Sequence, residues 1–197
     1  MFYPSLILSI HYSFFVYQQD LSSSISSLFN SESGKYWLGG FVEGEGTVCA
    51  SIKLDSNPKL KRPKIRVDLE FLVTQHYNGV HILNAFLILF DGNGHVRKKS
   101  GSDVCWDYRL KGLDNLWTYV VPFYQTYVLP FSGKRTEFNV FYQILLLQRD
   151  KAHLTKEGLI QIVKLAYTLN EEGKGSKRKR SLADVISIIE AQFDTSD

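Results

Sequence analysis

The chain has 197 residues, of which 44% are hydrophobic and 22% charged, so it can bury the core of one domain and is not a low-complexity or largely disordered protein. Its two cysteines, Cys49 and Cys105, exclude a scaffold built on disulfides. The net charge of +3 is too small by itself to indicate a nucleic-acid partner, so that question depends on where the charges lie along the chain.

The first 34 residues differ from the rest of the sequence. Residues 1–19 carry no Asp, Glu, Lys or Arg, and residues 22–33 are rich in serine. A membrane span is one interpretation, but scattered polar residues dilute the apolar run below the roughly 20 residues that a span needs. A signal peptide would begin with positive charge, which is missing. We therefore expect a leader over 1–34 that is not part of the core, a single domain over 35–197, and no membrane association.

The hydrophobic periodicity then predicts an ordered series of elements. The second predicted strand alternates clearly, with apolar residues at its odd positions and mainly polar residues at its even positions. The predicted elements are a helix at 35–44, strands at 47–54 and 64–74, a helix at 80–90, a turn at 91–94, a hairpin of strands at 95–99 and 104–111, and helices at 113–124, 135–148, 155–169 and 182–193. Short links between paired strands favour an antiparallel sheet and therefore an α+β fold.

Residues 37–46 break two local rules. Gly39, Gly40 and Gly44 lie within a helix, where each costs about 1 kcal/mol relative to alanine. Glu43 and Glu45 stand at the C-terminal end of that helix, where the helix dipole disfavours carboxylates. Such conflicts indicate either a functional site or a glycine-rich helix end with solvated glutamates, and physical chemistry alone leaves both open.

The segment 38–46, LGGFVEGEG, resembles the signature of the LAGLIDADG homing endonucleases in its Glu-Gly form. Blocks at 73–75, 94–97, 153–159 and 169–170 follow in the order of that family, and the resemblance extends over roughly residues 35–193. It implies an αββαββα core with a saddle-shaped antiparallel sheet over the DNA major groove and with C-terminal helices. It also implies that motif helices from two halves pack side by side at the centre.

The number of motifs decides the assembly that the resemblance implies. Residues 87–94 only superficially echo the signature and are better interpreted as a helix end and a tight turn. One motif means one half, so we expect a homodimer that reads a pseudo-palindromic site. The expected interface residues are Trp37, Gly40, Phe41 and Gly44.

The resemblance also implies a metal-dependent hydrolysis of DNA phosphodiesters. Glu45 matches the metal-binding acid, and Gly44 can add its backbone carbonyl to the site of Mg²⁺, for which Mn²⁺ can substitute. Gln75 matches the residue that orients the attacking water, and Lys134 the basic residue near the scissile phosphate. The alternatives are a polar strand end for Gln75 and a solvated turn for Lys134. Gly79 departs from the family, which often has a further basic residue shortly after the water-orienting position.

The polar faces of the strands are the expected DNA-reading surface. Arginine reads guanine, and carboxylates accept from cytosine amino groups, so both charge types suit it, although acids near phosphates need a cationic partner or a base edge. The alternative is an ordinary solvated sheet face. The expected DNA-binding residues are Cys49, Ser51, Lys53, Lys61, Arg62, Lys64, Arg66, Asp68, Glu70, His95, Arg97, Lys99, Asp107 and Arg109.

The function that the resemblance implies is that of a site-specific double-strand DNA endonuclease encoded by a mobile intron. Two alternatives use the same surface: an RNA maturase that assists splicing of its host intron, since structured RNA is recognised largely by shape, and a DNA-binding derivative that no longer cleaves. The usual hosts of the family suggest a mitochondrion or a plastid.

Overall fold

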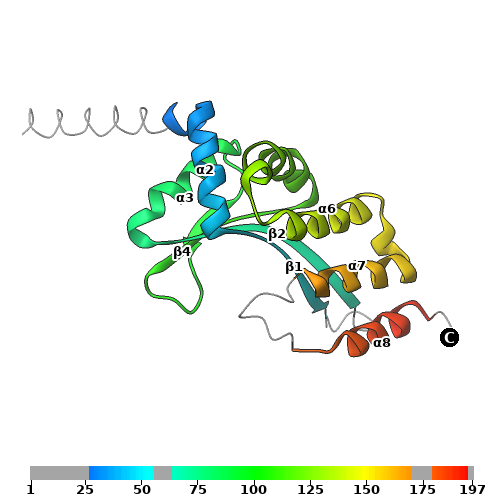
Figure 1. Cartoon of the computed structure of the whole chain (residues 1–197). Coiled ribbons are helices and arrows are strands. Elements are labelled where there is room, and N and C mark those ends of the chain that lie inside the picture. The colour runs from blue at the N-terminus through cyan, green and yellow to red at the C-terminus, as the bar shows by residue number, and fades with distance from the viewer. Residues whose placement is uncertain (1–26, 56–63, 170–178, 195–197) are drawn as a thin grey trace, which may run out of the picture.

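A computed structural model describes residues 27–55, 64–169 and 179–194 of the chain. A four-stranded antiparallel sheet in the order β1-β2-β4-β3 forms its centre. The strands are β1 (Gly46–Asp55), β2 (Lys64–His76), β3 (His95–Lys98) and β4 (Cys105–Lys111). The long strands β1 and β2 curve across the molecule in Figure 1, and the predicted α+β class is confirmed.

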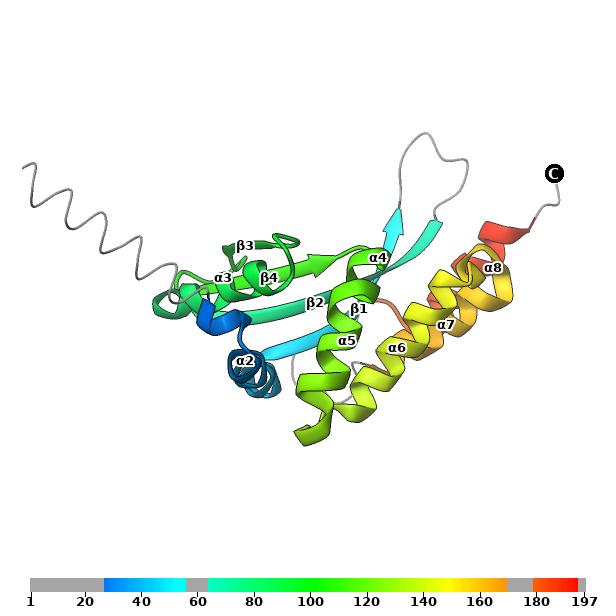
Figure 2. The ribbon, with the colours of Figure 1, turned by 90° about the horizontal axis from the view of Figure 1, so that it is seen from above.

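The helices pack against one face of this sheet (Figures 1 and 2). They are α2 (Glu32–Glu45), the short η1 (Tyr77–Gly79), α3 (Val80–Leu89), α6 (Arg135–Arg149), η5 (Ala152–Leu154), α7 (Lys156–Thr168) and α8 (Leu182–Phe193). Each agrees with a predicted helix or connection. Among the described helices, none combines the length and the apolar character needed to cross a membrane.

The helix predicted at 113–124 continues to residue 131 and is irregular. It runs through α4 (Leu113–Asn115), the π-helix η2 (Leu116–Val120), α5 (Val121–Phe123), the π-helix η3 (Tyr124–Val128) and the 3-10 turn η4 (Leu129–Phe131). Pro122 has no backbone N–H to donate, and the helix around it is widened on both sides. The predicted end at residue 124 was wrong, because helical backbone continues through Val128 and ends only in the 3-10 turn that contains Pro130.

The motif helix α2 begins earlier than predicted. Ser31 caps it by accepting a hydrogen bond from the Gly34 N–H at 3.1 Å. Residues 27–30 are helical as well, and Phe29 packs against Trp37 with ring centroids 5.9 Å apart. The folded unit therefore includes residues 27–34, which the sequence analysis assigned to the leader, while residues 1–26 lie outside the described part of the chain.

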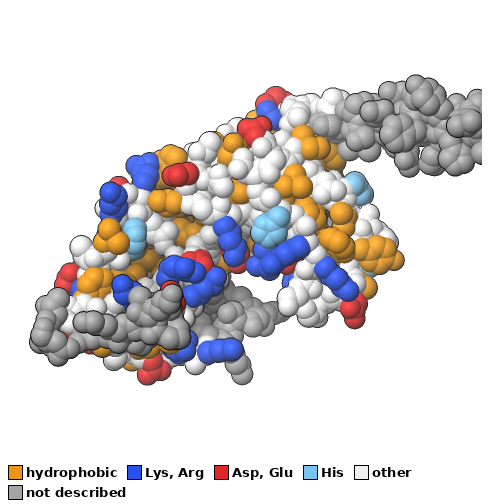
Figure 3. Space-filling model, turned by 180° about the vertical axis from the view of Figure 1, so that it is seen from behind, with side chains coloured by type: hydrophobic (Ala, Val, Ile, Leu, Met, Phe, Trp, Pro, Cys, Tyr) orange, Lys and Arg blue, Asp and Glu red, His pale blue; other side chains and the backbone are white. Residues whose placement is uncertain are grey.

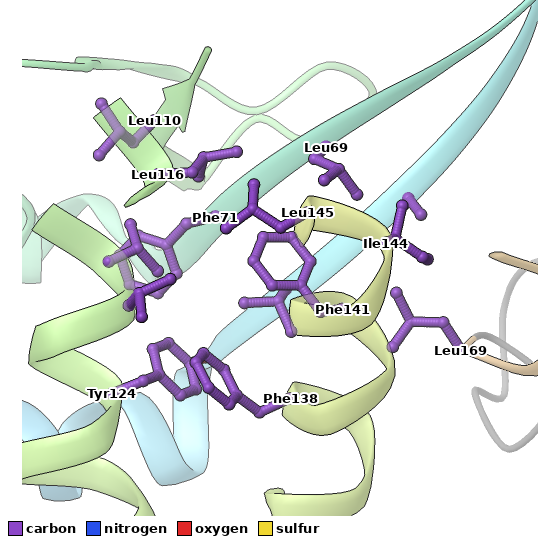
Figure 4. Close-up of a cluster of buried hydrophobic side chains, with 14 of the residues drawn as sticks. Leu69, Phe71, Leu110, Leu116, Tyr124, Phe138, Phe141, Ile144, Leu145 and Leu169 are labelled. Carbon is purple, nitrogen blue, oxygen red and sulfur yellow. The ribbon is translucent and has the colours of Figure 1, made fainter. Parts of the chain in front are cut away.

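The core lies between the sheet and the helices (Figure 4). Phe71 of β2 is fully buried and meets Tyr124 edge-on, and Tyr124 stacks on Phe138 of α6 with ring centroids 4.6 Å apart. The odd-numbered residues Ile65, Val67, Leu69, Phe71 and Val73 are all buried, as their alternation predicts. Burial of a side chain of this size stabilises the fold by about 1.5–3 kcal/mol. The odd-numbered residues of β2 therefore form the core face of the sheet, and its even-numbered residues lie on the opposite face.

Candidate active site and nucleic-acid interface

The strand register brings the predicted polar residues onto one face of the sheet. Directly paired residues share a face, and the register pairs Cys49 with Glu70, Glu70 with Lys111, and Arg109 with His95. The predicted DNA-binding residues that the structure places on this face are Cys49, Ser51, Lys53, Lys64, Arg66, Asp68, Glu70, His95, Arg97, Lys99, Asp107 and Arg109. Lys61 and Arg62 lie outside the described residues.

The carboxylates on this face are held by neighbouring cations. Asp107 is fully buried, and its carboxylate accepts from the Arg109 guanidinium at 2.9 Å and from the Thr74 hydroxyl at 2.8 Å. Glu70 is buried beside Arg109 at 3.4 Å and Lys111 at 3.1 Å. Asp107 was predicted to bind DNA; it lies on the predicted face, but it is fully buried and its carboxylate is bound to Arg109.

This charged cluster changes the chemistry of its members. Burial alone would lower the pKa of Arg109, but the carboxylates of Asp107 and Glu70 raise that pKa overall. Burial, assisted by the charge of Glu70, raises the pKa of the Cys49 thiol to about 12. Cys49 is therefore a neutral thiol at physiological pH and brings no thiolate to the surface.

Farther along the same face, Asp68 is bound by two cations. Its carboxylate lies 2.6 Å from Lys53 Nζ and 2.8 Å from Arg66 Nε. Although partial burial acts the other way, these cations lower the pKa of Asp68. His95 and Arg97 are exposed, and no described residue forms an ion pair with either of them. Figure 3 shows Lys and Arg side chains, with histidines among them, in a band across this view of the molecule. The exposed side chains of the band are therefore mainly cationic.

The motif helix delivers Glu45 to one end of this sheet. Glu45 is the last residue of α2 and is exposed, and Gly46 begins β1 directly after it. Because Gly46 pairs with Val73, Gln75 lies two residues farther along β2, at the same end of the sheet. The register therefore puts Glu45 and Gln75, two of the three predicted catalytic residues, at the same end of the sheet.

Gln75 is held by its own neighbourhood. Its Oε1 accepts from the His76 backbone N–H at 2.7 Å. A Cβ at Gly79 would overlap Gln75 Cγ, so position 79 has room for glycine alone unless Gln75 moves. The departure from the family at Gly79 thus has a structural reason, which is the packing of Gln75 against that glycine.

The Lys134 side chain, from the turn before α6, contacts the C-terminal end of the motif helix α2. Its Nζ donates to the carbonyl of Val42 at 3.1 Å and to the carbonyl of Gly46. Burial lowers the pKa of this half-buried lysine, and the carboxylates of Glu137, Glu43 and Glu45 oppose that effect. The interpretation of Lys134 as a solvated turn residue is therefore wrong, because its ammonium group is docked at the end of α2.

The remaining acid of the motif points elsewhere. Glu43 accepts from the Ser132 hydroxyl and from the Gly133 backbone N–H at 3.1 Å. Sequence reasoning found neither Ser132 nor Gly133, because no local pattern signals a contact between residues about 90 positions apart.

The oxygen atoms at the end of α2 suit a hard divalent cation. The Glu45 carboxylate and the Gly44 carbonyl are ligands of the kind that Mg²⁺ prefers, and Mg²⁺ usually keeps several waters and binds substrate phosphate oxygens as well. Within the described residues, no group of three or more His, Cys, Asp and Glu side chains gathers into a ready-made metal cluster. The Glu45 carboxylate and the Gly44 carbonyl are the oxygen donors of the described residues at this helix end that fit the shell of Mg²⁺.

The outer face of α2 carries two glycines beside an exposed aromatic pair. Trp37 is 50% exposed and stacks on Phe41 with ring centroids 5.5 Å apart. Among the described residues, a Cβ at Gly40 or Gly44 would meet no atom within 4 Å, whereas a Cβ at Gly39 would overlap the carbonyl oxygen of Tyr127. Gly39 therefore lets η3 of the same chain pack closely against α2, whereas Gly40 and Gly44 lie on the side of α2 that faces away from the described residues.

A family model described as LAGLIDADG endonuclease matches residues 38–145, more than half of the chain. The chain belongs to the LAGLIDADG endonuclease family. The family membership predicted from the signature at residues 38–46 is confirmed. The match includes Glu45, Gln75 and Lys134, the three residues that the sequence analysis assigned to catalysis.

Named relatives of this LAGLIDADG endonuclease agree with the family match. Homing endonuclease I-ApeII of Aeropyrum pernix is 30% identical over 155 residues, which cover 78% of this chain and 88% of that protein. DNA endonuclease I-CeuI of Chlamydomonas moewusii is 38% identical over 128 residues, which cover 64% of this chain and 57% of the relative.

Solved structures of family members share the fold. An archaeal intron-encoded homing endonuclease, I-Vdi141I, complexed with DNA, has a TM-score of 0.69 and 29% identity, covering 80% of this chain and 94% of that one. The group I intron-encoded I-CeuI complexed with DNA has a TM-score of 0.71 and 25% identity, covering 96% of this chain and all 100% of that one. The similarity therefore extends well beyond the signature.

Proposed function

We propose that this LAGLIDADG protein is a site-specific double-strand DNA endonuclease of an intron-encoded homing element, acting as a homodimer on a pseudo-palindromic target. The observation that carries the proposal is the docking of Lys134 at the end of the motif helix that carries Glu45. Gln75 lies at the same end of the sheet. A carboxylate, an amide and an ammonium group at one end of a sheet with cations on its face suit hydrolysis of a phosphodiester.

In this proposal each residue has one task. Glu45 and the Gly44 carbonyl hold Mg²⁺ or Mn²⁺, which when bound neutralises phosphate charge and lowers the pKa of water. Gln75 orients the attacking water through its amide, since its packing against Gly79 limits how it can turn. The Lys134 ammonium stabilises the negative charge that develops on the phosphate.

Dimer formation in the proposal uses the exposed stripe of α2. Gly40 and Gly44 leave room for another helix to approach closely, and the Trp37–Phe41 pair supplies apolar surface at its side. A two-fold arrangement presents the same patch from both protomers and brings two Glu45 side chains to the axis. Two nearby carboxylates repel each other, which favours cation binding between them.

DNA binding in the proposal uses the polar face of the sheet. The exposed Arg97 suits phosphate and base contacts, as do the Lys61 and Arg62 side chains, which follow β1 in the sequence and lie outside the described residues. Arg109 is presented in an orientation fixed by Asp107. Neutralisation of Asp68, Glu70 and Asp107 by neighbouring cations removes the repulsion that free carboxylates would exert on phosphates.

A cleavage assay tests the proposal directly. The purified chain is incubated with a library of randomised duplexes, and with the joined sequences that flank its own gene, in Mg²⁺ or Mn²⁺. We expect double-strand cleavage at one site, dependent on the metal and abolished by Glu45→Gln. If the folded, dimeric protein cuts no duplex with either Mg²⁺ or Mn²⁺, the proposed endonuclease activity is refuted.

The same variant separates the endonuclease from a maturase that binds host intron RNA. Loss of cutting with retained splicing assistance in Glu45→Gln would show that the RNA activity is present and uses the surface without the catalytic acid. The intron-encoded relatives from Chlamydomonas and Neurospora favour an organelle, and we propose a mitochondrion or plastid as the location. Imaging of a tagged chain in its host checks this location.

A further inference from the structure

Glu43 has the least favourable position of the acids in the motif helix. It lies in the last turn of α2, where the helix dipole disfavours a carboxylate. Its two oxygens are nevertheless both occupied, one by the Ser132 hydroxyl and the other by the Gly133 N–H at 3.1 Å. Because the carboxylate stands where the helix dipole disfavours it and is bonded to a turn about 90 positions away in the sequence, we infer that it holds that turn in place.

The turn that Glu43 holds is the one that presents Lys134. Ser132 Oγ accepts from the Lys134 backbone N–H at 2.8 Å, and the Lys134 carbonyl accepts from the Phe138 N–H at 2.9 Å at the start of α6. The side chain of Lys134 then returns to α2, where its Nζ donates to the carbonyl of Val42 at 3.1 Å. The contacts form a closed ring from Glu43 through the turn to Lys134 and back to the residue before Glu43.

We propose that Glu43 is a positioning residue, whose carboxylate fixes the turn at residues 132–134 so that the Lys134 ammonium stays beside Glu45 at the end of the motif helix. The inference rests on the proposed function only in assigning Lys134 to the phosphate. Glu43 touches neither DNA nor the reacting atoms in this account. Its effect on cleavage passes entirely through Lys134.

The fold does not depend on this ring of contacts. Helix α6 is anchored by the buried side chains of Phe138, Phe141, Ile144 and Leu145, and α2 by Leu38 and Val42. Removal of the Glu43 carboxylate therefore frees the turn while the helices stay packed. Since a displacement of about 1 Å at a reacting centre can cost on the order of 100-fold in rate, a freed Lys134 should be visible in the kinetics.

The test compares single-turnover cleavage rates at saturating enzyme with DNA affinity measured in Ca²⁺. We expect Glu43→Ala to slow cleavage about 10- to 100-fold with unchanged affinity, and Ser132→Ala, which removes one contact of Glu43 and also the acceptor of the Lys134 N–H, to slow it by a comparable factor. In a Lys134→Met background Glu43→Ala should cost nothing further. The matched control is Glu32→Ala on the same helix, whose carboxylate accepts from the Tyr127 hydroxyl at 3.0 Å and should leave the rate within about twofold.

A second readout does not need cleavage. Lysines are dimethylated with ¹³C, and the NMR signal of Lys134 is assigned by its loss in Lys134→Met. Glu43→Ala should move that signal toward the position of solvent-exposed lysines, and Glu32→Ala should not. A shifted signal in a protein that cuts no duplex would support the positioning role and refute the proposed function separately.

Two results would overturn the positioning role. One is an equal rate loss from Glu43→Ala in the wild-type and Lys134→Met backgrounds, which would mean a general structural effect. The other is a Lys134 signal that does not respond to Glu43→Ala. If Glu43→Ala fails to fold, the same two comparisons are made with Ser132→Ala, which keeps the Glu43 carboxylate and its bond to Gly133.

Discussion

At the scale of single residues, the site depends on how each functional side chain is restrained. Gln75 is packed against Gly79, Lys134 is docked on two carbonyls, and Arg109 is held by Asp107 and Glu70. Long polar side chains lose considerable rotamer freedom when they are ordered, and here much of that cost is met by folding before any DNA arrives.

Gly79→Ala tests the restraint on Gln75. The new Cβ would overlap Gln75 Cγ and force the side chain to move, so we expect cleavage to slow about 10- to 100-fold. DNA affinity should stay unchanged, since the sheet face is untouched. Single-turnover kinetics and binding titrations measure both quantities. Gly101→Ala is the control for a glycine substitution that meets no neighbour, although its positive φ brings a small loss of stability.

Asp107→Ala tests the charged cluster. It removes a fully buried carboxylate and leaves Arg109, which is only 18% exposed, without its shortest ion pair. We expect the free energy of unfolding in denaturant titrations to fall by about 2–4 kcal/mol. Asp103→Ala, which breaks the exposed pair with Lys98, should change it by less than about 1 kcal/mol. Equal effects from the two substitutions would contradict the structural role of Asp107.

At the scale of elements, α2 uses its glycines on two different sides. The buried side, with Gly39, receives η3 of the same chain, and on the exposed side no atom of the described ranges would come within 4 Å of a Cβ at Gly40 or Gly44. A helix with four glycines, Gly34 near its start and Gly39, Gly40 and Gly44 farther along, is weak by itself, since each interior glycine costs about 1 kcal/mol relative to alanine. Packing on both sides would offset this cost, one side within the protomer and the other between protomers.

Adjacent substitutions separate these two sides. Gly39→Leu should lower the free energy of unfolding by about 2 kcal/mol or more, because its side chain meets the Tyr127 backbone. Gly40→Leu should keep the protomer folded by circular dichroism but shift sedimentation from dimer to monomer. A dimer that persists with Gly40→Leu would remove this face of α2 from the interface.

At the scale of the whole molecule, the parts that follow from local pattern were predictable. The alternation of β2 and the spacing of α8 fixed their bounds closely, and the family resemblance supplied Gln75 and Lys134. The burial of Asp107 was not predictable, because alternation gives its face but not its ion pair. The bond of Glu43 to Ser132 was also out of reach, since it depends on how two distant segments pack.

The mass of the protein–DNA complex tests the central claim most directly. The purified chain is mixed with its target duplex in Ca²⁺, and the complex is weighed by sedimentation equilibrium or native mass spectrometry. We predict two chains on each duplex, with the motif helices paired so that one Glu45 lies near each scissile phosphate. One chain on each duplex, with both strands still cut when Mg²⁺ is added, would contradict the account.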